Sequence, residues 1–223
     1  MLRSSASRWS RLSLRSAISA LSLLISTQLA PRTARAEGAG ARLPRSSEVG
    51  SGDGVYGRFD GDLDLGLALG AELGSAGQAA PALRATAHYF SIAGVYANGR
   101  IKAGDESAPS LFGVGVDLRP LFVPRWAKGL ETGCALFDLT LDSLSLSLGA
   151  FWAKPGAQEA ASQRGFDAQL GLGVPLLATA AGPWLEARGA LRYPDGASRE
   201  EAVLLLLSWH GFVTTPFSRG SSL

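Results

Sequence analysis

Cysteine, histidine and lysine are scarce in this chain of 223 residues, and each shortage excludes a class of protein. The single cysteine, Cys134, rules out an internal disulfide. Two histidines and one cysteine are too few for the usual zinc-binding motifs. Only three lysines occur, whereas soluble helical proteins carry many on their exposed faces. No Gly-Lys-Ser/Thr phosphate-binding motif is present, and we expect neither a metal nor a cofactor.

The first 36 residues differ from the remainder of the chain and predict a secretory signal peptide. Arginine is their only charged residue type, and an uncharged, mainly apolar run follows over 17–30. Ala34-Arg35-Ala36 then forms a small-x-small cleavage pattern just before Glu37. The apolar run is shorter than the roughly 20 residues that a spanning helix needs. A mitochondrial presequence is the alternative, because the segment is rich in arginine and serine and lacks acidic residues.

Removal of this segment would reverse the sign of the net charge. The whole chain has 21 basic and 19 acidic residues, and six arginines lie within residues 1–36. The mature part keeps 15 basic against 19 acidic residues, a net charge of −4, which argues against a nucleic-acid partner. We expect a signal peptide at 1–36, a flexible leader at 37–54, a barrel at 55–215 and a C-terminal tail at 216–223.

Apolar residues alternate with small or polar residues along most of the mature chain. Leucine stands at every second position from 63 to 69, with aspartate, glycine and alanine between. Because successive side chains of a strand point to opposite faces, such alternation predicts strands with one apolar face. The first run extends from Tyr56 to Leu73, and others begin near residues 82, 111, 143, 165, 183 and 202. Turn residues separate several of them, including the favoured tight-turn pair Asn98-Gly99 within 97–100.

Residues 119–142 interrupt the alternation and decide the number of strands. They include two prolines, and the apolar parity changes between Leu141 and Leu144. A β-bulge, a loop with a helical turn, or a hairpin at Asp142-Ser143 would each fit this segment. Bacterial membrane barrels of a single chain have even numbers of strands, so we expect eight rather than seven.

The residues that alternate with the apolar ones form the second face of each predicted strand, and their composition distinguishes a membrane barrel from a soluble sheet. The second face carries glycine, alanine and serine with scattered charges, rather than the lysine, glutamate, threonine and glutamine of a water-facing sheet. Eight strands close into a barrel whose interior is just filled by side chains, which suits small residues and paired charges. Runs of about ten residues match the length that crosses a bilayer. We therefore expect an all-β, antiparallel up-and-down β-barrel that is transmembrane.

This pattern resembles that of small bacterial outer-membrane β-barrel proteins over roughly residues 56–213. The resemblance implies a cell-envelope protein whose partner is outer-membrane lipid. Such barrels often end on an aromatic residue, whereas this chain continues beyond Phe212 and Phe217 to a polar end. Aromatic residues near the run ends are the candidates for interfacial belts: Tyr56, Phe59, Tyr89, Tyr96, Trp152, Trp184, Tyr193 and Trp209.

Charged residues on the second face predict an ion-paired network inside the barrel. Buried charges require partners, and an eight-stranded barrel leaves little room for a conducting path. The expected members of this interior polar network are Asp62, Asp64, Glu72, Arg84, Asp117, Glu186, Arg188 and Arg192.

His88, Ser208 and His210 are the candidates for catalysis, although no catalytic motif is present. The stretch from His88 to Ser91 loosely resembles the His-x-Ser-Asn motif of outer-membrane lipid A deacylases, but the match fails, because His88 and Ser91 are three positions apart and Ile92 follows Ser91 in place of asparagine. Ser208 and His210 share a face without a marked acidic partner. We therefore expect a structural or interaction barrel of the outer membrane. The alternatives are a barrel enzyme acting on lipid, and a soluble periplasmic barrel whose Leu/Phe face lines a lipid pocket.

If residues 1–36 are a signal peptide, the exported protein should begin at Glu37. Mass spectrometry of the N-terminal peptide from envelope-derived protein measures this directly. A mature start within the first 15 residues would contradict secretion by this route.

Overall fold

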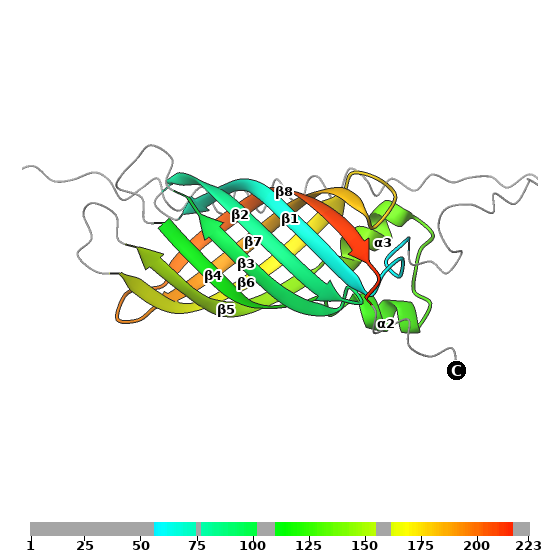
Figure 1. The fold of residues 1–223 in the computed structure, drawn as a ribbon, viewed down its shortest axis with the longest axis horizontal. Helices are drawn as coiled ribbons and strands as arrows, with labels where there is room; N and C mark the ends of the chain where they lie inside the picture. Colours follow the sequence, from blue (N-terminus) through cyan, green and yellow to red (C-terminus); the bar gives the residue numbers. More distant parts are fainter. Residues whose placement is uncertain (1–55, 75–76, 102–109, 155–161, 216–223) are drawn as a thin grey trace, which may run out of the picture. The chain divides into compact units, whose positions relative to one another are not determined.

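Eight antiparallel strands close into a barrel in sequence order, with β8 pairing back to β1 (Figure 1). The computed structural model describes residues 56–74, 77–101, 110–154 and 162–215. The predicted all-β, antiparallel up-and-down barrel of eight strands is confirmed. The predicted signal peptide at 1–36, leader at 37–54 and tail at 216–223 lie outside the described residues.

The strands contain 8 to 14 residues each and are inclined to the barrel axis (Figure 1). We call the end at which β1 begins the helix end, because two short helices lie there, and the opposite end the loop end. The strands are β1 (Leu63–Gly74), β2 (Ala79–Tyr89), β3 (Ala93–Arg100), β4 (Ser110–Leu118), β5 (Ser145–Lys154), β6 (Gln163–Pro175), β7 (Gly182–Pro194) and β8 (Glu200–Val213).

The alternation of the sequence decides which side chains point outward. On β1, Leu67 and Leu69 are 57% and 63% exposed, whereas Asp64 is buried. Adjacent strands repeat the pattern in register, since Leu67 lies opposite Ala85 of β2 and Trp209 of β8. The Leu/Phe face is therefore the outer surface. The alternative of a soluble barrel with this face lining an internal lipid pocket is wrong for the described strands.

The segment that interrupts the alternation, residues 119–142, does not supply the eighth strand. Residues 119–142 form a connection with two helices, α2 (Phe122–Ala127) and α3 (Ala135–Asp142), so the loop with a helical turn was the correct alternative. Neither of these described helices has the length and hydropathy of a membrane-spanning helix. The eighth strand is β3, and β1 begins at Leu63 because residues 56–60 form a turn and bend.

The turn predicted at Asn98-Gly99 is wrong, because both residues lie within β3. Asn98 points into the barrel with 4% exposure and lies opposite Arg84 of β2 and Gly113 of β4. Hydrogen-bonded strands on both sides hold this segment extended, so sheet pairing overrides the local turn preference.

Three aromatic residues assigned to interfacial belts lie elsewhere. Tyr96 and Trp184 point into the barrel and are 2% and 7% exposed. Tyr56 is partly buried and packs beside the helix-end cluster of Leu139, Ala180 and Trp184. This cluster places α3 across the helix end, so the sequence between β4 and β5 closes that end.

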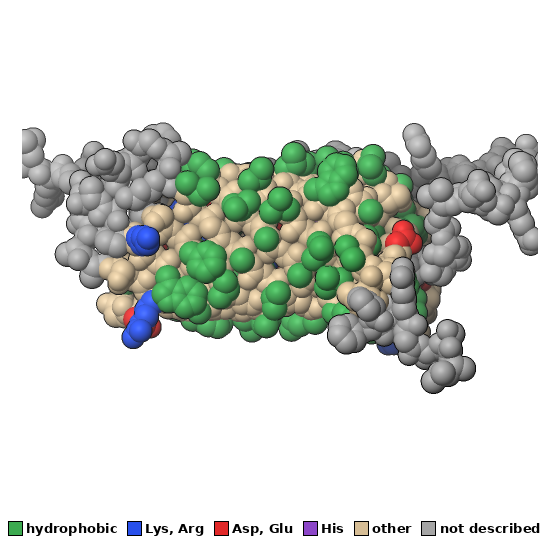
Figure 2. Space-filling model, in the orientation of Figure 1, with side chains coloured by type: hydrophobic (Ala, Val, Ile, Leu, Met, Phe, Trp, Pro, Cys, Tyr) green, Lys and Arg blue, Asp and Glu red, His purple; other side chains and the backbone are tan. Residues whose placement is uncertain are grey.

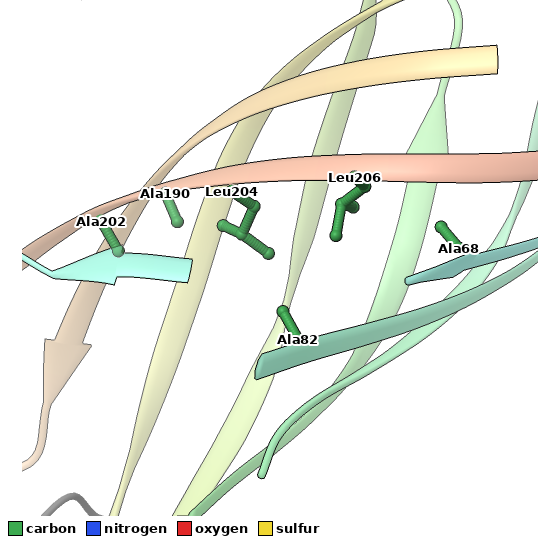
Figure 3. Packing of buried hydrophobic residues seen from close by; sticks show 6 residues of the cluster. All are labelled: Ala68, Ala82, Ala190, Ala202, Leu204 and Leu206. Carbon is green, nitrogen blue, oxygen red and sulfur yellow. The ribbon is translucent and has the colours of Figure 1, made fainter. Parts of the chain in front are cut away.

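Apolar side chains fill the interior toward the loop end. Leu111, Phe151 and Ala153 form one buried cluster between β4 and β5. A second cluster draws on β1, β2, β7 and β8, whose side chains converge inside the barrel (Figure 3). Its members are Ala68, Ala82, Ala190, Ala202, Leu204 and Leu206.

Tyr96 occupies space that two glycines on neighbouring strands leave free. Gly115 of β4 lies opposite Gly149 of β5. A Cβ on Gly149 would overlap the carbonyl oxygen of Val114 and lie 2.5 Å from Tyr96 Oη. The absence of side chains therefore permits the close approach of β4 and β5 beneath the Tyr96 ring.

We expect Gly149→Ala to lower the free energy of unfolding by about 1–3 kcal/mol, the usual cost of overpacking. Gly189→Ala is the matched control, because a Cβ on this strand glycine would meet nothing within 4 Å. Urea titration of both variants measures the difference. Equal stability of the two variants would show that β4 and β5 are not packed as closely as the structure has them.

Candidate functional site

The barrel interior contains equal numbers of paired acidic and basic groups. Five carboxylates and five arginines form ion pairs with one another there, so their formal charges cancel. Such pairing is required because an unpaired charge in a narrow, buried interior is strongly destabilising. The carboxylates are Asp64, Glu72, Asp117, Asp167 and Glu186, and the arginines are Arg84, Arg100, Arg119, Arg188 and Arg192.

Asp117, near the end of β4, is the principal acceptor of the interior and is fully buried. Its Oδ2 lies 2.7 Å from His88 Nε2, while Oδ1 lies 3.3 Å from Arg84 Nη2 and 3.4 Å from Arg188 Nη1. The hydroxyl of Ser147 also donates to Oδ1. Groups from β2, β4, β5 and β7 therefore meet at one carboxylate, which links strands far apart in the sequence.

Asp64 is a second acceptor, nearer the helix end. It accepts a hydrogen bond from Arg119 Nη1 at 2.8 Å, and its Oδ1 lies 3.0 Å from His210 Nδ1. His210 Nε2 lies 3.4 Å from Glu186 Oε1, and Arg188 Nε lies 3.1 Å from Glu186 Oε2. With a His88–Asp64 separation of 3.8 Å, these contacts close a ring across the barrel. Its members are Asp117, His88, Asp64, His210, Glu186 and Arg188.

Glu72 anchors the network at the loop end. Arg192 donates from Nη1 and Nη2 to its two carboxylate oxygens, each at 2.7 Å, and Arg100 donates at 2.9 Å. The two-bond geometry of Arg192 is the strong form of an arginine–carboxylate contact. Glu72 therefore connects β1 to β3 and β7 where the barrel interior becomes apolar.

A separate set of ion pairs holds α3 at the helix end. Asp138 accepts hydrogen bonds from Tyr56 Oη at 2.8 Å, Arg125 Nη2 at 2.6 Å and the Thr132 backbone N–H at 3.0 Å. Burial alone would raise the pKa of Asp138, but these hydrogen bonds outweigh burial and hold its pKa below the ordinary value. Burial and the Asp138 contact raise the pKa of Tyr56 to about 12. Asp138 therefore stays ionised and keeps its donors in place.

Seven of the eight residues predicted for the network come together in the interior. Asp62 lies apart from them, at the start of β1, where the backbone and hydroxyl of Thr215 donate to its carboxylate. These bonds hold the pKa of Asp62 below its ordinary value. The seven are Asp64, Glu72, Arg84, Asp117, Glu186, Arg188 and Arg192.

Several members of the network were not predicted. Asp167 and Gln169 alternate with the apolar face of β6 and could have been found from that parity. Gln169 accepts from Arg84 at 3.0 Å and donates to Asp167 at 2.6 Å. Arg119 lies beyond the end of its strand, where alternation gives no direction. Its position depends on the course of the connection to α2.

The three catalytic candidates all point into the barrel. His88 is fully buried against Asp117, and Ser208 and His210 are 3% and 6% exposed. His210 has the acidic partners that the sequence did not mark, Asp64 and Glu186. The cavity beside His210 measures about 10 Å³, which is enough for about one water molecule. A lipid acyl chain is much larger than this cavity.

The part of the chain that the structure describes contains no group of histidine, cysteine, aspartate and glutamate side chains suited to a metal ion. The histidines of the interior instead contact carboxylates. Their arrangement organises charge and hydrogen bonding between strands.

No family model matches the chain, and no curated protein matches it. Among solved structures, the chain is similar to Ail, the attachment invasion locus protein of Yersinia pestis, solved in complex with the heparin analogue sucrose octasulfate. The two are 14% identical over 67% of this chain and 96% of that chain, with a TM-score of 0.35. A likeness at this level transfers neither fold nor function, and the fold of this chain rests on its own strand pairing.

We expect Asp117→Asn to lower the free energy of unfolding by about 3–5 kcal/mol, because it leaves Arg84 and Arg188 without their shared buried carboxylate. Asp195→Asn is the control, since the Asp195–Arg164 pair is 68% and 78% exposed and its loss should leave stability unchanged. Urea titration at neutral pH compares the two. Equal small effects would mean that the Asp117 contacts do not carry stability.

Proposed function

We propose that this protein is an outer-membrane β-barrel of structural or interaction type, with a narrow, polar, ion-paired interior. One observation carries the proposal: the outer surface of the closed barrel is apolar along the strands, while its charges are inside. Water would penalise such a surface, and soluble monomers rarely expose large contiguous apolar patches. The hydrocarbon chains of a bilayer would instead contact this apolar surface favourably.

The outward side chains form a belt between charged ends, and Figure 2 shows this arrangement on one face. Charged outward residues such as Lys154, Arg164 and Glu201 lie at the loop end of their strands. The belt includes Leu65, Leu67, Leu69, Leu83, Val95, Phe112, Val116, Leu146, Leu148, Phe166, Leu170, Val174, Leu185, Leu191, Leu205, Leu207 and Trp209, all 36% exposed or more.

Aromatic residues lie at both rims of this belt. Phe112 and Trp152 stack with centroids 6.3 Å apart, and Phe166 lies 6.5 Å from Tyr193, all at the loop end. Tyr89 is 53% exposed at the helix end of β2. Aromatic girdles at both rims of an apolar band are typical of outer-membrane barrels. The predicted signal peptide would supply the export route.

The interior supports a structural or interaction role over transport or catalysis. Side chains fill the middle of the barrel, and α3 packs across the helix end. The catalytic candidates lie among these packed groups, so we assign His88 and His210 to the ion-paired network and Ser208 to the buried residues beside it. Contacts with partners would then be made by the outer surface and the two ends.

Introducing charge along β1 tests the membrane location. Leu67 is 57% exposed within the strand, so Leu67→Arg should lower the free energy of unfolding from a bilayer by about 2–4 kcal/mol. Leu63→Arg, at the helix end of β1, should cost about 0–1 kcal/mol and become more costly in a thicker bilayer. Urea titration in bilayers of two thicknesses measures both.

A barrel that faces water gives a different outcome. Leu67→Arg would then be an exposed surface substitution with an effect within about 0.5 kcal/mol, and bilayer thickness would have no influence. Recovery of the wild-type chain as a soluble monomer without detergent would also overturn the proposal.

A further inference from the structure

An apolar groove of about 350 Å³ opens on the surface at the helix end of the barrel. Three segments build it: the turn before β1, the turn between β2 and β3, and α2. Every lining residue has an apolar side chain, so nothing in the groove selects a polar ligand. The lining residues are Phe59, Phe90, Ile92, Phe122, Val123 and Trp126.

Phe59 holds the aromatic walls of the groove together. Its ring centroid lies 5.3 Å from that of Trp126, 5.8 Å from Phe122 and 6.3 Å from Phe90. Phe90 and Ser91 both have left-handed backbone angles, with φ of 49° and 56°. Positive φ at two successive residues is the geometry of a tight hairpin turn, which is closed here by a hydrogen bond from the Ile92 N–H to the Tyr89 carbonyl at 3.1 Å, so these angles shape the β2–β3 turn that carries Phe90.

The base of the groove is fixed by an ion pair. Phe122 is 2% exposed, and the Arg58 guanidinium carbon lies 4.6 Å from its ring centroid. Arg58 is held in turn by Asp142 of α3 at 2.6 Å. The groove is therefore a built feature, because buried contacts hold α2 against the barrel end.

We propose that this groove binds one hydrocarbon chain of a membrane lipid. The proposal rests on the membrane location proposed above. Two observations select this occupant: the lining is wholly apolar, and the groove borders the helix-end rim of the belt, since the ring of Phe90 lies 4.6 Å from that of Tyr89, which is 53% exposed there. Its volume is also within the usual range for a ligand site.

Lipid binding would hold α2 and the β2–β3 turn against the bilayer surface. Trp126 is 46% exposed and Ile92 is 36% exposed, so both present apolar surface outside the strands. Each methylene group that the groove buries should increase affinity about fourfold. A chain seated here would therefore select lipids by hydrocarbon contact rather than by headgroup.

Tryptophan fluorescence in bilayers of phosphatidylcholine brominated on its acyl chains tests the groove. One reporter protein keeps Trp126 in the groove, and the other keeps Trp209 on the belt; Trp184 is 7% exposed and stays in both as a shielded background. The first carries W9F, W152F and W209F, and the second carries W9F, W126F and W152F. We expect bromine to quench both reporters.

Ile92→Asp places a carboxylate in the groove and should reduce quenching of Trp126 by at least about threefold, since a charge excludes hydrocarbon. Trp209 should remain fully quenched, which shows that the barrel is still folded in the bilayer. Leu130→Asp is the matched control: Leu130 is an equally apolar residue of the same connection, 54% exposed, and does not line the groove. It should leave Trp126 unaffected.

Each other outcome overturns a specific statement. Quenching of Trp209 but not Trp126 would reject the groove and leave the membrane barrel standing. Absence of quenching at both residues would reject the membrane location and the groove together. Protection of Trp126 from bromine and from aqueous iodide, relieved by deletion of residues 216–223, would show that the chain's own tail occupies the groove. Equal effects of Ile92→Asp and Leu130→Asp would reject a discrete site.

Discussion

The narrow interior of an eight-stranded barrel requires every charged side chain that enters it to find a partner inside. Asp117 meets this requirement for several charges at once, because two arginines and one histidine share its carboxylate. Glu72 does the same toward the loop end. The resulting contacts connect strands that are distant in sequence, so the same groups that neutralise charge also tie the barrel together. The histidines take part in the same contacts, because His88 lies against Asp117 and His210 against Asp64.

Because the charged side chains point into the barrel, its outer surface consists mainly of apolar residues. This inversion of the usual arrangement follows from the alternation along each strand: the residue that follows a buried charge points away from the interior. The helix end adds apolar surface beyond the strands, where α2 and the β2–β3 turn form the groove. The ion pairs of Arg58 and Arg125 with α3 hold this region in place, so the interior and the surface at the helix end depend on one another.

Alternation predicted seven strands and their faces, because it records directly which side chains share an environment. It did not predict β3, where alternation is unclear and where the local turn preference of Asn98-Gly99 indicated a turn instead of a strand. Asn98-Gly99 has the composition of a tight turn, yet pairing with β2 and β4 keeps it extended. Tyr96 is a large aromatic residue near a run end, but the facing glycines Gly115 and Gly149 make room for it inside.

The sequence by itself determined seven of the strands, their apolar faces and most of the charged residues opposite those faces, because strand periodicity is a local property of the chain. Only the tertiary structure decided which charges meet. The ring from Asp117 through His210 depends on the register of strands, and Arg119, just beyond the end of β4, reaches the ring through its contact with Asp64. The helices of residues 119–142 and the groove beside them also depend on contacts between segments far apart in sequence, which periodicity does not encode.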